Sequence, residues 1–261
     1  MSKVLITGSA DGLGKMAARL LVAQGHTVIL HARNAQRAKE ALTSVPGAQD
    51  AIPGDLSSIA ATKAVAARAN ELGPFDAIIH NAAIGYQERK RIATTDGLPA
   101  VFAVNSLAPY ILTCLIGKPR RLIYLSSGLH RSGDPSLKDL IWEQRPWNGY
   151  AAYSDSKLHD VILAFAIARK WKDVHSNSVE PGWVATKMGG PGAPDSLAEG
   201  PVTQAWLAVS EDQAAQTTGR HFYHKTQKEP HPAAADPAVQ EKFLTECARL
   251  SGVAFHPSSV H

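Results

Sequence analysis

Short apolar runs alternate with amphipathic stretches through about the first 180 residues of the chain. Strand-like apolar runs lie at residues 4–7, 27–31, 50–52, 75–80, 121–125 and 175–179. Helical patterns lie between them, at residues 13–24, 34–44, 57–71, 98–116 and 153–170. Each right-handed crossover between parallel strands places a helix against the sheet. The pattern therefore predicts an α/β fold: a single doubly wound Rossmann-type domain, whose parallel sheet has about seven strands and helices on both faces.

Capping and breaking residues predict where the helices begin and end. Asn34, Ser57 and Asp195 each precede a helical pattern and carry a side-chain oxygen that can accept from free N–H groups at a helix start. Pro109 predicts an interruption of the helix at residues 98–116, because proline lacks the backbone donor.

The chain after residue 181 is less regular. Its glycine- and proline-rich residues 184–194 predict a loop, and the helix capped by Asp195 is expected to run to residue 209. A final strand at residues 219–224 and a helix at residues 238–250 follow. We expect these parts to complete one domain that spans residues 1–261.

Composition narrows the class of protein. Apolar residues make up 44% of the chain and charged residues 19%, as in ordinary globular domains. The net charge of +4 is spread along the chain without a like-charged run, so no nucleic-acid partner is predicted. The two distant cysteines indicate a reducing compartment, and no signal-like segment or apolar stretch of roughly 18 residues occurs. We therefore expect a cytoplasmic protein without a membrane partner.

A glycine-rich turn follows the first predicted strand. Residues 7–14 read T-G-S-A-D-G-L-G and lead directly into a helical pattern. Glycines let the backbone approach phosphate groups, and the free N–H groups of a helix start favour their negative charge. The turn therefore predicts a dinucleotide pyrophosphate site, although a tight turn without a ligand has the same composition.

Tyr153 and Lys157 are four residues apart on a predicted helix, which places them one turn apart on the same face. A fixed ammonium favours phenolate, so Lys157 is expected to lower the pKa of Tyr153 and to make it a usable proton donor. Tyr150 is a competing tyrosine but has no lysine four residues later. A buried tyrosine beside a lysine that merely reaches solvent is the alternative interpretation.

The end of the second predicted strand bears on the choice of cofactor. An NAD enzyme of this architecture usually places an aspartate there to bind the ribose 2′-hydroxyl. This chain has His31, Ala32, Arg33 and Asn34 instead, and the guanidinium of Arg33 suits a 2′-phosphate. Arg33 therefore predicts NADP (NADPH). NAD is the alternative if Arg33 is only a solvated turn residue, and Asp11 in the glycine turn weighs toward it.

These motifs together resemble the short-chain dehydrogenase/reductase family, most distinctly over residues 4–186. The separation of 26 positions between Ser127 and Tyr153 is similar to that in the branch of retinol dehydrogenases and WW-domain oxidoreductases. His80 and Ala83 depart from the family's Asn-Asn-Ala-Gly turn at its first and last positions. The resemblance, with the residues discussed above, implies cofactor contacts by Thr7, Gly8, Ser9, Asp11, Gly12, Leu13, Gly14, Arg33, Asn34, Asp55, Leu56, Asn81, Ala82, Ala83, Tyr153, Lys157, Pro181, Gly182, Val184 and Thr186.

The same resemblance implies a catalytic relay of Asn105, Ser127, Tyr153 and Lys157. Tyr153 would exchange the proton, and Ser127 would hydrogen-bond the carbonyl oxygen. Lys157 would also bind the nicotinamide ribose, while Asn105 would hold a water that connects Lys157 to solvent. Ser127 is preferred to Ser126 because successive strand residues face opposite sides.

The neighbourhood of this relay supplies candidates for the substrate pocket. Tyr150, Trp183 and Met188 are expected to present apolar surface to the substrate, and Trp142 and Trp147 to line a wall beside it. The loop and helix at residues 184–210 are expected to cover the substrate. The resemblance also implies a homodimer or homotetramer.

The residues and the resemblance together predict an NADP(H)-dependent carbonyl reductase or alcohol dehydrogenase, which interconverts a ketone or aldehyde and its alcohol. Two alternatives remain: an NAD-dependent alcohol dehydrogenase of the same fold, and a non-catalytic nucleotide-sensing protein. The second would have no need of a proton relay. No metal site is predicted, because histidines such as His221 and His224 have no acidic residue at ligand spacing.

Overall fold

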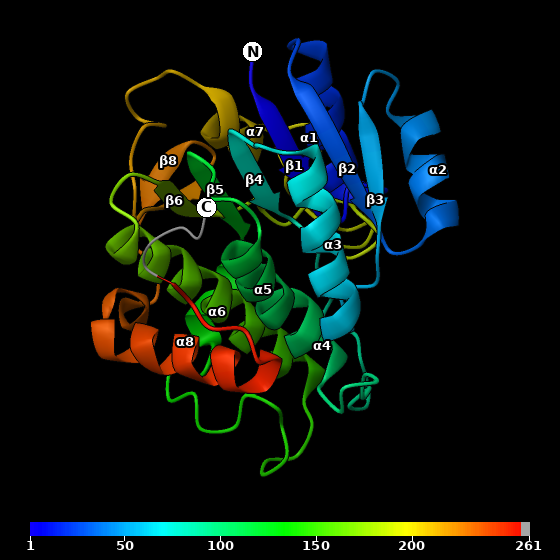
Figure 1. Cartoon of the computed structure of the whole chain (residues 1–261). Coiled ribbons are helices and arrows are strands. Elements are labelled where there is room, and N and C mark those ends of the chain that lie inside the picture. Colours follow the sequence, from blue (N-terminus) through cyan, green and yellow to red (C-terminus); the bar gives the residue numbers. More distant parts are fainter. Residues whose placement is uncertain (257–261) are drawn as a thin grey trace.

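Eight strands form one sheet in the order β3-β2-β1-β4-β5-β6-β7-β8 (Figure 1). The computed structural model describes residues 1–256, so residues 257–261 of the predicted domain lie outside the described part. The strands are β1 Lys3–Ile6, β2 Thr27–Ala32, β3 Asp50–Pro53, β4 Ala77–His80, β5 Arg121–Leu125, β6 His175–Glu180, β7 His221–Tyr223 and β8 Thr226–Lys228. All neighbours from β3 to β7 pair in parallel, which confirms the predicted doubly wound α/β fold.

Helices cover both faces of this sheet. They are α1 Gly12–Ala23, α2 Ala35–Ser44, α3 Ile59–Leu72, α4 Ala100–Phe102, η1 Ala103–Leu107, α5 Ala108–Leu115, η2 Gly128–Ser132, α6 Gly149–Lys170, α7 Val202–Val209, η3 Pro232–Ala235 and α8 Pro237–Ser251. Within residues 1–256, none is both long and apolar enough to cross a lipid bilayer.

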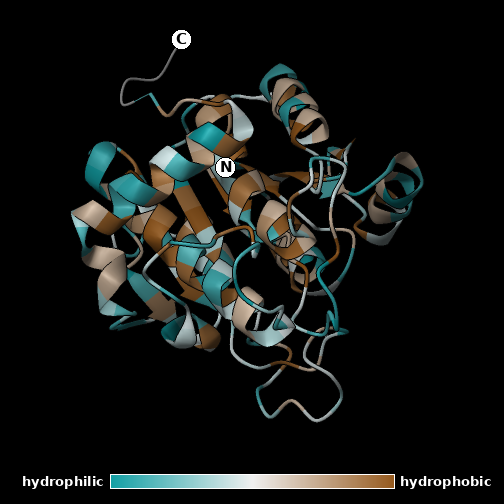
Figure 2. Cartoon of the chain, turned by 90° about the horizontal axis from the view of Figure 1, so that it is seen from below, coloured by the Kyte–Doolittle hydropathy of each residue, from teal (hydrophilic) through white to brown (hydrophobic). Residues whose placement is uncertain are grey.

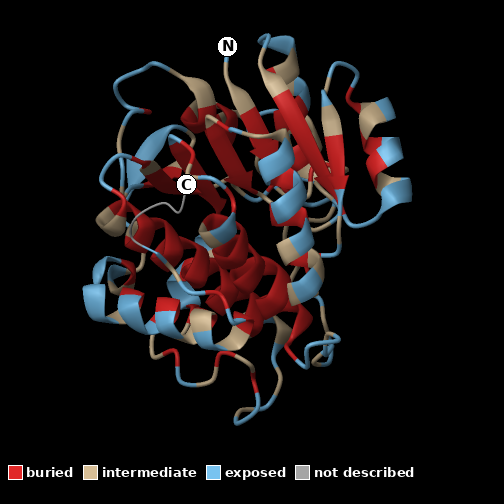
Figure 3. Ribbon diagram, in the orientation of Figure 1, coloured by how far each residue is buried: buried red, intermediate tan, exposed pale blue. Residues whose placement is uncertain are grey.

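Successive residues of a strand point to opposite faces of the sheet and pack into two separate apolar layers. In β1, Val4 and Ile6 pack with α1, α2 and α7, whereas Leu5 packs on the opposite face with α3, α5 and α6. Figure 2 shows the hydrophobic strands between helices of mixed character, and Figure 3 shows that α6 and the strands other than β8 are largely buried. Because both faces are covered, continuous apolar runs are what this sheet requires.

Within residues 1–256 the sheet has eight strands, one more than the approximate number predicted. Strand β8 pairs antiparallel with β7, and His224 and Lys225 form the tight turn between them. Both turn residues have positive φ, 47° and 60°. Such hairpin turns usually carry Asn or Gly. This chain has neither residue at the turn, so its sequence did not predict strand β8.

Two helix starts also differ from the prediction. Ser58, not Ser57, caps α3, because its Oγ accepts from the backbone N–H of Ala61 at 3.3 Å. The helix predicted to begin after Asp195 begins only at Val202, since the Asp195 carboxylate accepts from the backbone N–H of Trp183 instead. The predicted interruption near Pro109 is confirmed, since the π-helical segment η1 directly precedes the turn of α5 that holds this proline.

We expect Ser58→Ala to lower the free energy of unfolding by about 1 kcal/mol, the usual value of a helix N-cap. Urea unfolding followed by circular dichroism measures this change. Ser57→Ala is the matched control, because the Ser57 side chain caps nothing, and it should unfold like the wild type. Equal losses in the two variants would contradict the assignment of the cap.

Candidate active site

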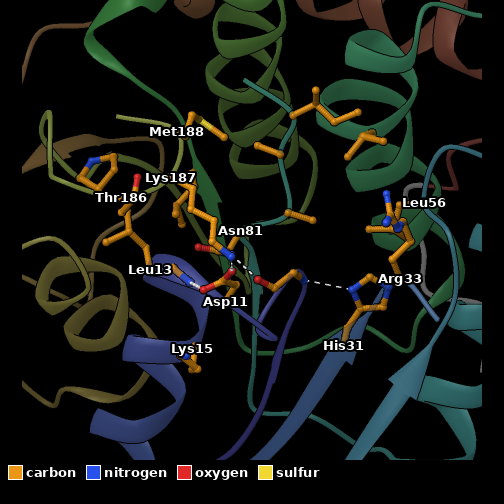
Figure 4. A pocket seen from close by; sticks show the side chains of 18 of the residues that line it. Asp11, Leu13, Lys15, His31, Arg33, Leu56, Asn81, Thr186, Lys187 and Met188 are labelled. Carbon is orange, nitrogen blue, oxygen red and sulfur yellow. Dashed lines mark hydrogen bonds and ion pairs between the residues drawn. The ribbon is translucent and has the colours of Figure 1, made fainter. Parts of the chain in front are cut away.

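A cavity of about 860 Å³ opens at the carboxyl ends of the parallel strands. It lies where the strand order reverses between β1 and β4, the position at which open α/β sheets bind ligands. Figure 4 shows Arg33 and Leu56 on one side of this cavity, Thr186, Lys187 and Met188 on the other, and Asp11 and Asn81 between them. The volume suits a ligand of dinucleotide or drug size.

The glycine-rich turn fits a phosphate group. Gly12 has a φ of +53°, and a Cβ added there would meet nothing within 4 Å, so this stretch of backbone is open toward the cavity. Gly8 and Gly14 have a different purpose. A Cβ on Gly8 would lie 2.7 Å from the Cα of Ala82, and one on Gly14 would collide with the Asn81 side chain. These two glycines therefore allow the turns after β1 and β4 to touch.

Hydrogen bonds join the same two turns. The Oγ1 of Thr7 accepts from the backbone N–H groups of Asn81 and Ala82 at 3.0 and 3.1 Å, and the Asn81 amide donates to the backbone oxygens of Thr7 and Gly8. His80 points away from this junction and stacks on the Tyr124 ring, with the centroids 4.8 Å apart. The departure from the family pattern at His80 is therefore accommodated in the core.

His31 connects the glycine turn to two further strands. Its Nδ1 accepts from the backbone N–H of Gly8 at 3.0 Å, so its Nε2 carries the proton and donates to the backbone oxygen of Gly54, also at 3.0 Å. Burial lowers the pKa of His31 to about 4 and keeps the ring neutral at neutral pH. The sequence shows His31 at the end of β2 but carries no signal for this role, because both partners are backbone groups that no spacing marks.

Basic side chains surround the end of the cavity beside the glycine turn. Arg33 is exposed directly after β2 and lines the cavity, as does Lys15. Asp11 bears the opposing charge, but its carboxylate pairs with Lys187 and lies 3.8 Å from the Arg37 guanidinium. The hydrogen bond from Lys187 lowers the pKa of Asp11, so the carboxylate stays ionised and neutralised. Lys187 was not predicted, because it comes from a loop 176 positions further along the chain.

The predicted proton donor lies at the inner end of the cavity. Tyr153 and Lys157 both line it from α6, and the Lys157 Nζ is 5.7 Å from the centroid of the Tyr153 ring. Burial raises the pKa of Tyr153, and Lys157 and Ser127 offset only part of this rise. The pKa of Tyr153 is therefore raised, whereas the Tyr–Lys spacing predicted that it would be lowered. Tyr153 is only 6% exposed, so its phenol loses most of its hydration and the charged form is disfavoured.

Asp160 is a partner of Lys157 that was not predicted from the sequence. The Lys157 Nζ donates to an oxygen of the Asp160 carboxylate at 2.8 Å and to the backbone oxygen of Leu125 at 2.7 Å. All of these groups are buried, and the carboxylate of Asp160 raises the pKa of Lys157 in spite of the burial. Lys157 is therefore an ammonium at neutral pH. The spacing of three residues on a helix was the available signal.

The two serines after β5 have different surroundings. The Oγ of Ser126 donates to the backbone oxygen of Lys157 at 2.8 Å and is thereby committed to holding α6. The Oγ of Ser127 accepts a 3.3 Å bond from Leu129 and stays close enough to Tyr153 to affect its phenol. This arrangement favours Ser127 as the serine that can reach a substrate, even though Ser126, and not Ser127, is among the residues that line the cavity.

Asn105 lies in the π-helical turn η1 and is fully buried. Its amide forms two hydrogen bonds with the backbone of Ile84, at 2.7 and 3.0 Å, and a third with Ser156. The side chain therefore holds the segment after β4 against α6.

The remaining predicted contacts divide into two groups. The cavity is lined by Gly8, Asp11, Gly12, Leu13, Arg33, Asp55, Leu56, Asn81, Ala82, Ala83, Tyr153, Lys157, Pro181, Thr186 and Met188. The other predicted residues lie behind this lining or away from it: Thr7, Ser9, Gly14, Asn34, Gly182, Val184, Tyr150 and Trp183. Asn34, for example, caps α2 through a bond to the backbone N–H of Arg37.

Several residues predicted for the substrate pocket or its wall are not among those that line the cavity. Trp142 is buried, packs edge-on against Trp147 and carries the Arg145 guanidinium 3.7 Å above its ring. Trp183 is 56% exposed. Helix α7, the last part of the segment predicted to cover the substrate, packs in the apolar layer with α1. Only the loop before it remains available as a cover.

Comparison with known proteins identifies the family. Residues 2–119 match the family model described as short chain dehydrogenase. The chain is 48% identical to an uncharacterized oxidoreductase of Emericella nidulans, over 97% of this chain and 98% of the relative. It is 31% identical to retinol dehydrogenase 13 of Homo sapiens, over 96% of this chain and 84% of that one. The chain therefore belongs to the short-chain dehydrogenase/reductase family and resembles its retinol dehydrogenase branch.

A solved structure agrees at the level of the fold. An uncharacterized protein from Mycobacterium Paratuberculosis superposes with a TM-score of 0.84 and 22% identity, over 98% of this chain and 95% of that one. Membership of the family makes the protein an oxidoreductase that acts on a small-molecule substrate with an NAD(P) cofactor.

The buried His31 predicts a loss of stability in acid. Its pKa of about 4 in the folded protein lies below the ordinary histidine value near 6.5, so its contribution is complete above pH 6.5 and is lost as the pH falls toward 4. Between pH 7 and 4.5 we expect His31→Gln to lose roughly 2 to 3 kcal/mol less than the wild type, because its amide does not titrate. Urea unfolding at both pH values measures the difference, and parallel losses in the two proteins would contradict it.

Proposed function

We propose that the protein is an NADP(H)-dependent carbonyl reductase or alcohol dehydrogenase, which interconverts a ketone or aldehyde and the corresponding alcohol. The observation that carries the proposal is the meeting of Tyr153 with a buried ammonium, Lys157, at the inner end of the cavity. A proton donor next to a fixed positive charge, in a site shielded from water, suits the protonation of an alkoxide.

The nicotinamide cofactor, when bound, supplies or accepts the hydride. Tyr153 gives its phenolic proton to the alkoxide oxygen that forms during reduction, and it takes that proton back during alcohol oxidation. Ser127 donates a hydrogen bond to the same oxygen and holds it in line. Lys157 stabilises the phenolate that remains, and so offsets the burial that raises the pKa of Tyr153.

The residues present fit the cofactor at both ends. Gly12 leaves open backbone for the phosphates, and Thr186 lies on the cavity wall, where the nicotinamide carboxamide is expected. Arg33 is the group we assign to the 2′-phosphate. The pairing of Asp11 with Lys187 supports NADP over NAD, because it removes the repulsion that a free carboxylate would exert on a phosphate.

The substrate end of the cavity is apolar. The Tyr153 hydroxyl lies 3.7 Å from the sulfur of Met188, and the Tyr86 ring packs edge-on against the Tyr153 ring at 5.6 Å. Met188 belongs to the loop before α7, which we propose as the cover over the substrate. Thioether and aromatic surfaces favour a carbonyl substrate with a hydrophobic body.

Removing the phenolic proton tests the chemistry. Tyr153→Phe should lower kcat by about 10² to 10⁴, the usual contribution of a positioned acid, and leave NADPH affinity unchanged. A panel of ketones and aldehydes, followed through the absorbance of the reduced nicotinamide, measures turnover. Tyr110→Phe is the control, since it removes a buried phenol that bonds Val253 far from the cavity. Near-normal turnover by Tyr153→Phe would remove Tyr153 from the role, and no turnover by the wild type would favour a nucleotide sensor.

Replacing Arg33 tests the cofactor assignment. Arg33→Ala removes a charge-assisted bond of about 1.5 to 3 kcal/mol, so KM for NADPH should rise about tenfold or more while KM for NADH changes little. Adding Ala32→Asp should then favour NADH. Arg68→Ala is the control, because it removes an exposed arginine that pairs with Glu71 on α3. Equal use of NADH and NADPH by the wild type would contradict the assignment before any variant is made.

A further inference from the structure

Three side chains that are distant in the sequence converge behind the candidate active site. His130 lies on η2, Glu180 is the last residue of β6, and His221 begins β7. One ligand atom from each lies within 4.8 Å of the others. The two imidazole rings are 4.6 Å apart between centroids. None of the three has a role in the proposed reaction.

The Nδ1 atom of each imidazole ring lies within hydrogen-bond distance of an oxygen. The Nδ1 of His130 donates to the backbone oxygen of Ser127 at 2.6 Å, which leaves its buried Nε2 as a lone pair without a hydrogen-bond partner. The Nδ1 of His221 lies 2.9 Å from the Oγ of Ser178, so its Nε2 faces the Glu180 carboxylate at 3.5 Å. Metal-ligating histidines characteristically bond an oxygen through one nitrogen and present the other to the ion.

We propose that His130, Glu180 and His221 form a binding site for a divalent transition-metal ion, with zinc the best match. Two imidazole nitrogens and one carboxylate oxygen are a common zinc donor set, whereas calcium and magnesium prefer oxygen ligands alone. Tetrahedral coordination at about 2 Å requires ligand atoms roughly 3.3 Å apart, so closure needs side-chain movements of about 1 Å.

The surroundings permit such an ion. Burial lowers the pKa of His130 to about 4, so the ring is neutral and keeps its lone pair at neutral pH. A Cβ at position 128 would lie 3.3 Å from the Glu180 carboxylate. Gly128 has no side chain, so it leaves space beside this carboxylate. The Glu180 side chain is 20% exposed, whereas His221 is enclosed. Solvent therefore reaches the cluster from the carboxylate side and can supply a fourth ligand.

An ion at this place would brace the active site from behind. His130 contacts the backbone oxygen of Ser127, and Glu180 directly precedes Pro181, which lines the cavity. The ion would join the ends of β6 and β7 to the turn that carries Ser127. We therefore assign it a structural role, in which it holds the serine and the turn after β6 in register.

Metal binding by the untagged, chelator-treated protein tests the proposal. Titration with ZnCl₂ in a calorimeter should show one equivalent bound, with a dissociation constant in the micromolar range or tighter, and zinc should raise the melting temperature. Substitution with Co²⁺ should give the intense visible absorption of a tetrahedral site. The absence of saturable uptake of one equivalent, or a weak octahedral cobalt spectrum, would overturn the site whatever the variants do.

Conservative variants locate the ion. Glu180→Gln and His221→Gln should each weaken zinc affinity by about tenfold or more, since loss of even an outer-shell partner commonly costs 10- to 100-fold. His175→Gln, at the opposite end of β6, is the matched control and should bind zinc like the wild type. Unchanged affinity in the first two variants, or an equal loss in the control, would place the ion elsewhere and contradict the proposal. Circular dichroism verifies that each variant is folded.

Discussion

The contact between the turn after β1 and the turn after β4 is the constraint on which the rest of the site depends. Thr7 and Asn81 exchange hydrogen bonds across it, and Gly8 lets the backbone of Ala82 approach closer than any side chain would permit. This contact fixes the point at which the strand order reverses. Crossovers leave the sheet in opposite directions there, so the strand ends remain uncovered and a cavity opens between them.

Buried charge sets the chemistry on the other side of this cavity. Lys157 is enclosed, and a lone ammonium would lose its proton in such a place. The carboxylate of Asp160 and the backbone oxygen of Leu125 keep it protonated. In a buried ion pair the attraction between the charges mostly offsets the cost of dehydrating them, so the Lys157–Asp160 pair adds little to stability. Its main effect is to hold a positive charge near Tyr153.

The same helix and strand ends serve several purposes at once. Ser126 holds α6 through the backbone of Lys157, while Ser127 stays available to a substrate and accepts from His130 through its backbone oxygen. The proposed metal cluster therefore lies directly behind the proposed active site. Its members come from η2, β6 and β7. No metal site was predicted, because His221 and His224 have no acidic residue at ligand spacing along the sequence.

Local pattern determined much of this protein. The apolar runs predicted all of the parallel strands, and T-G-x-x-x-G-x-G with the Tyr153 and Lys157 spacing indicated the family that the comparisons confirm. These patterns can be recognised in the sequence because they depend on residues three or four positions apart, or on the alternation of residues along a strand. The helix starts were harder to predict. Ser57 and Ser58 both carry a hydroxyl that can cap a helix, and only the path of the backbone decides which of them caps α3.

Tertiary structure alone decided the long-range pairings. The partnership of Lys187 with Asp11, the bonds from His31 to two backbone groups and the convergence of His130, Glu180 and His221 join residues from separate elements. Burial also reversed the expected net shift in the Tyr153 pKa, because desolvation depends on the atoms that surround the phenol. The sequence by itself determined the fold, the family and the groups that we propose for the reaction. Their charges and partners were decided by folding, which brings distant residues together and removes water from between them.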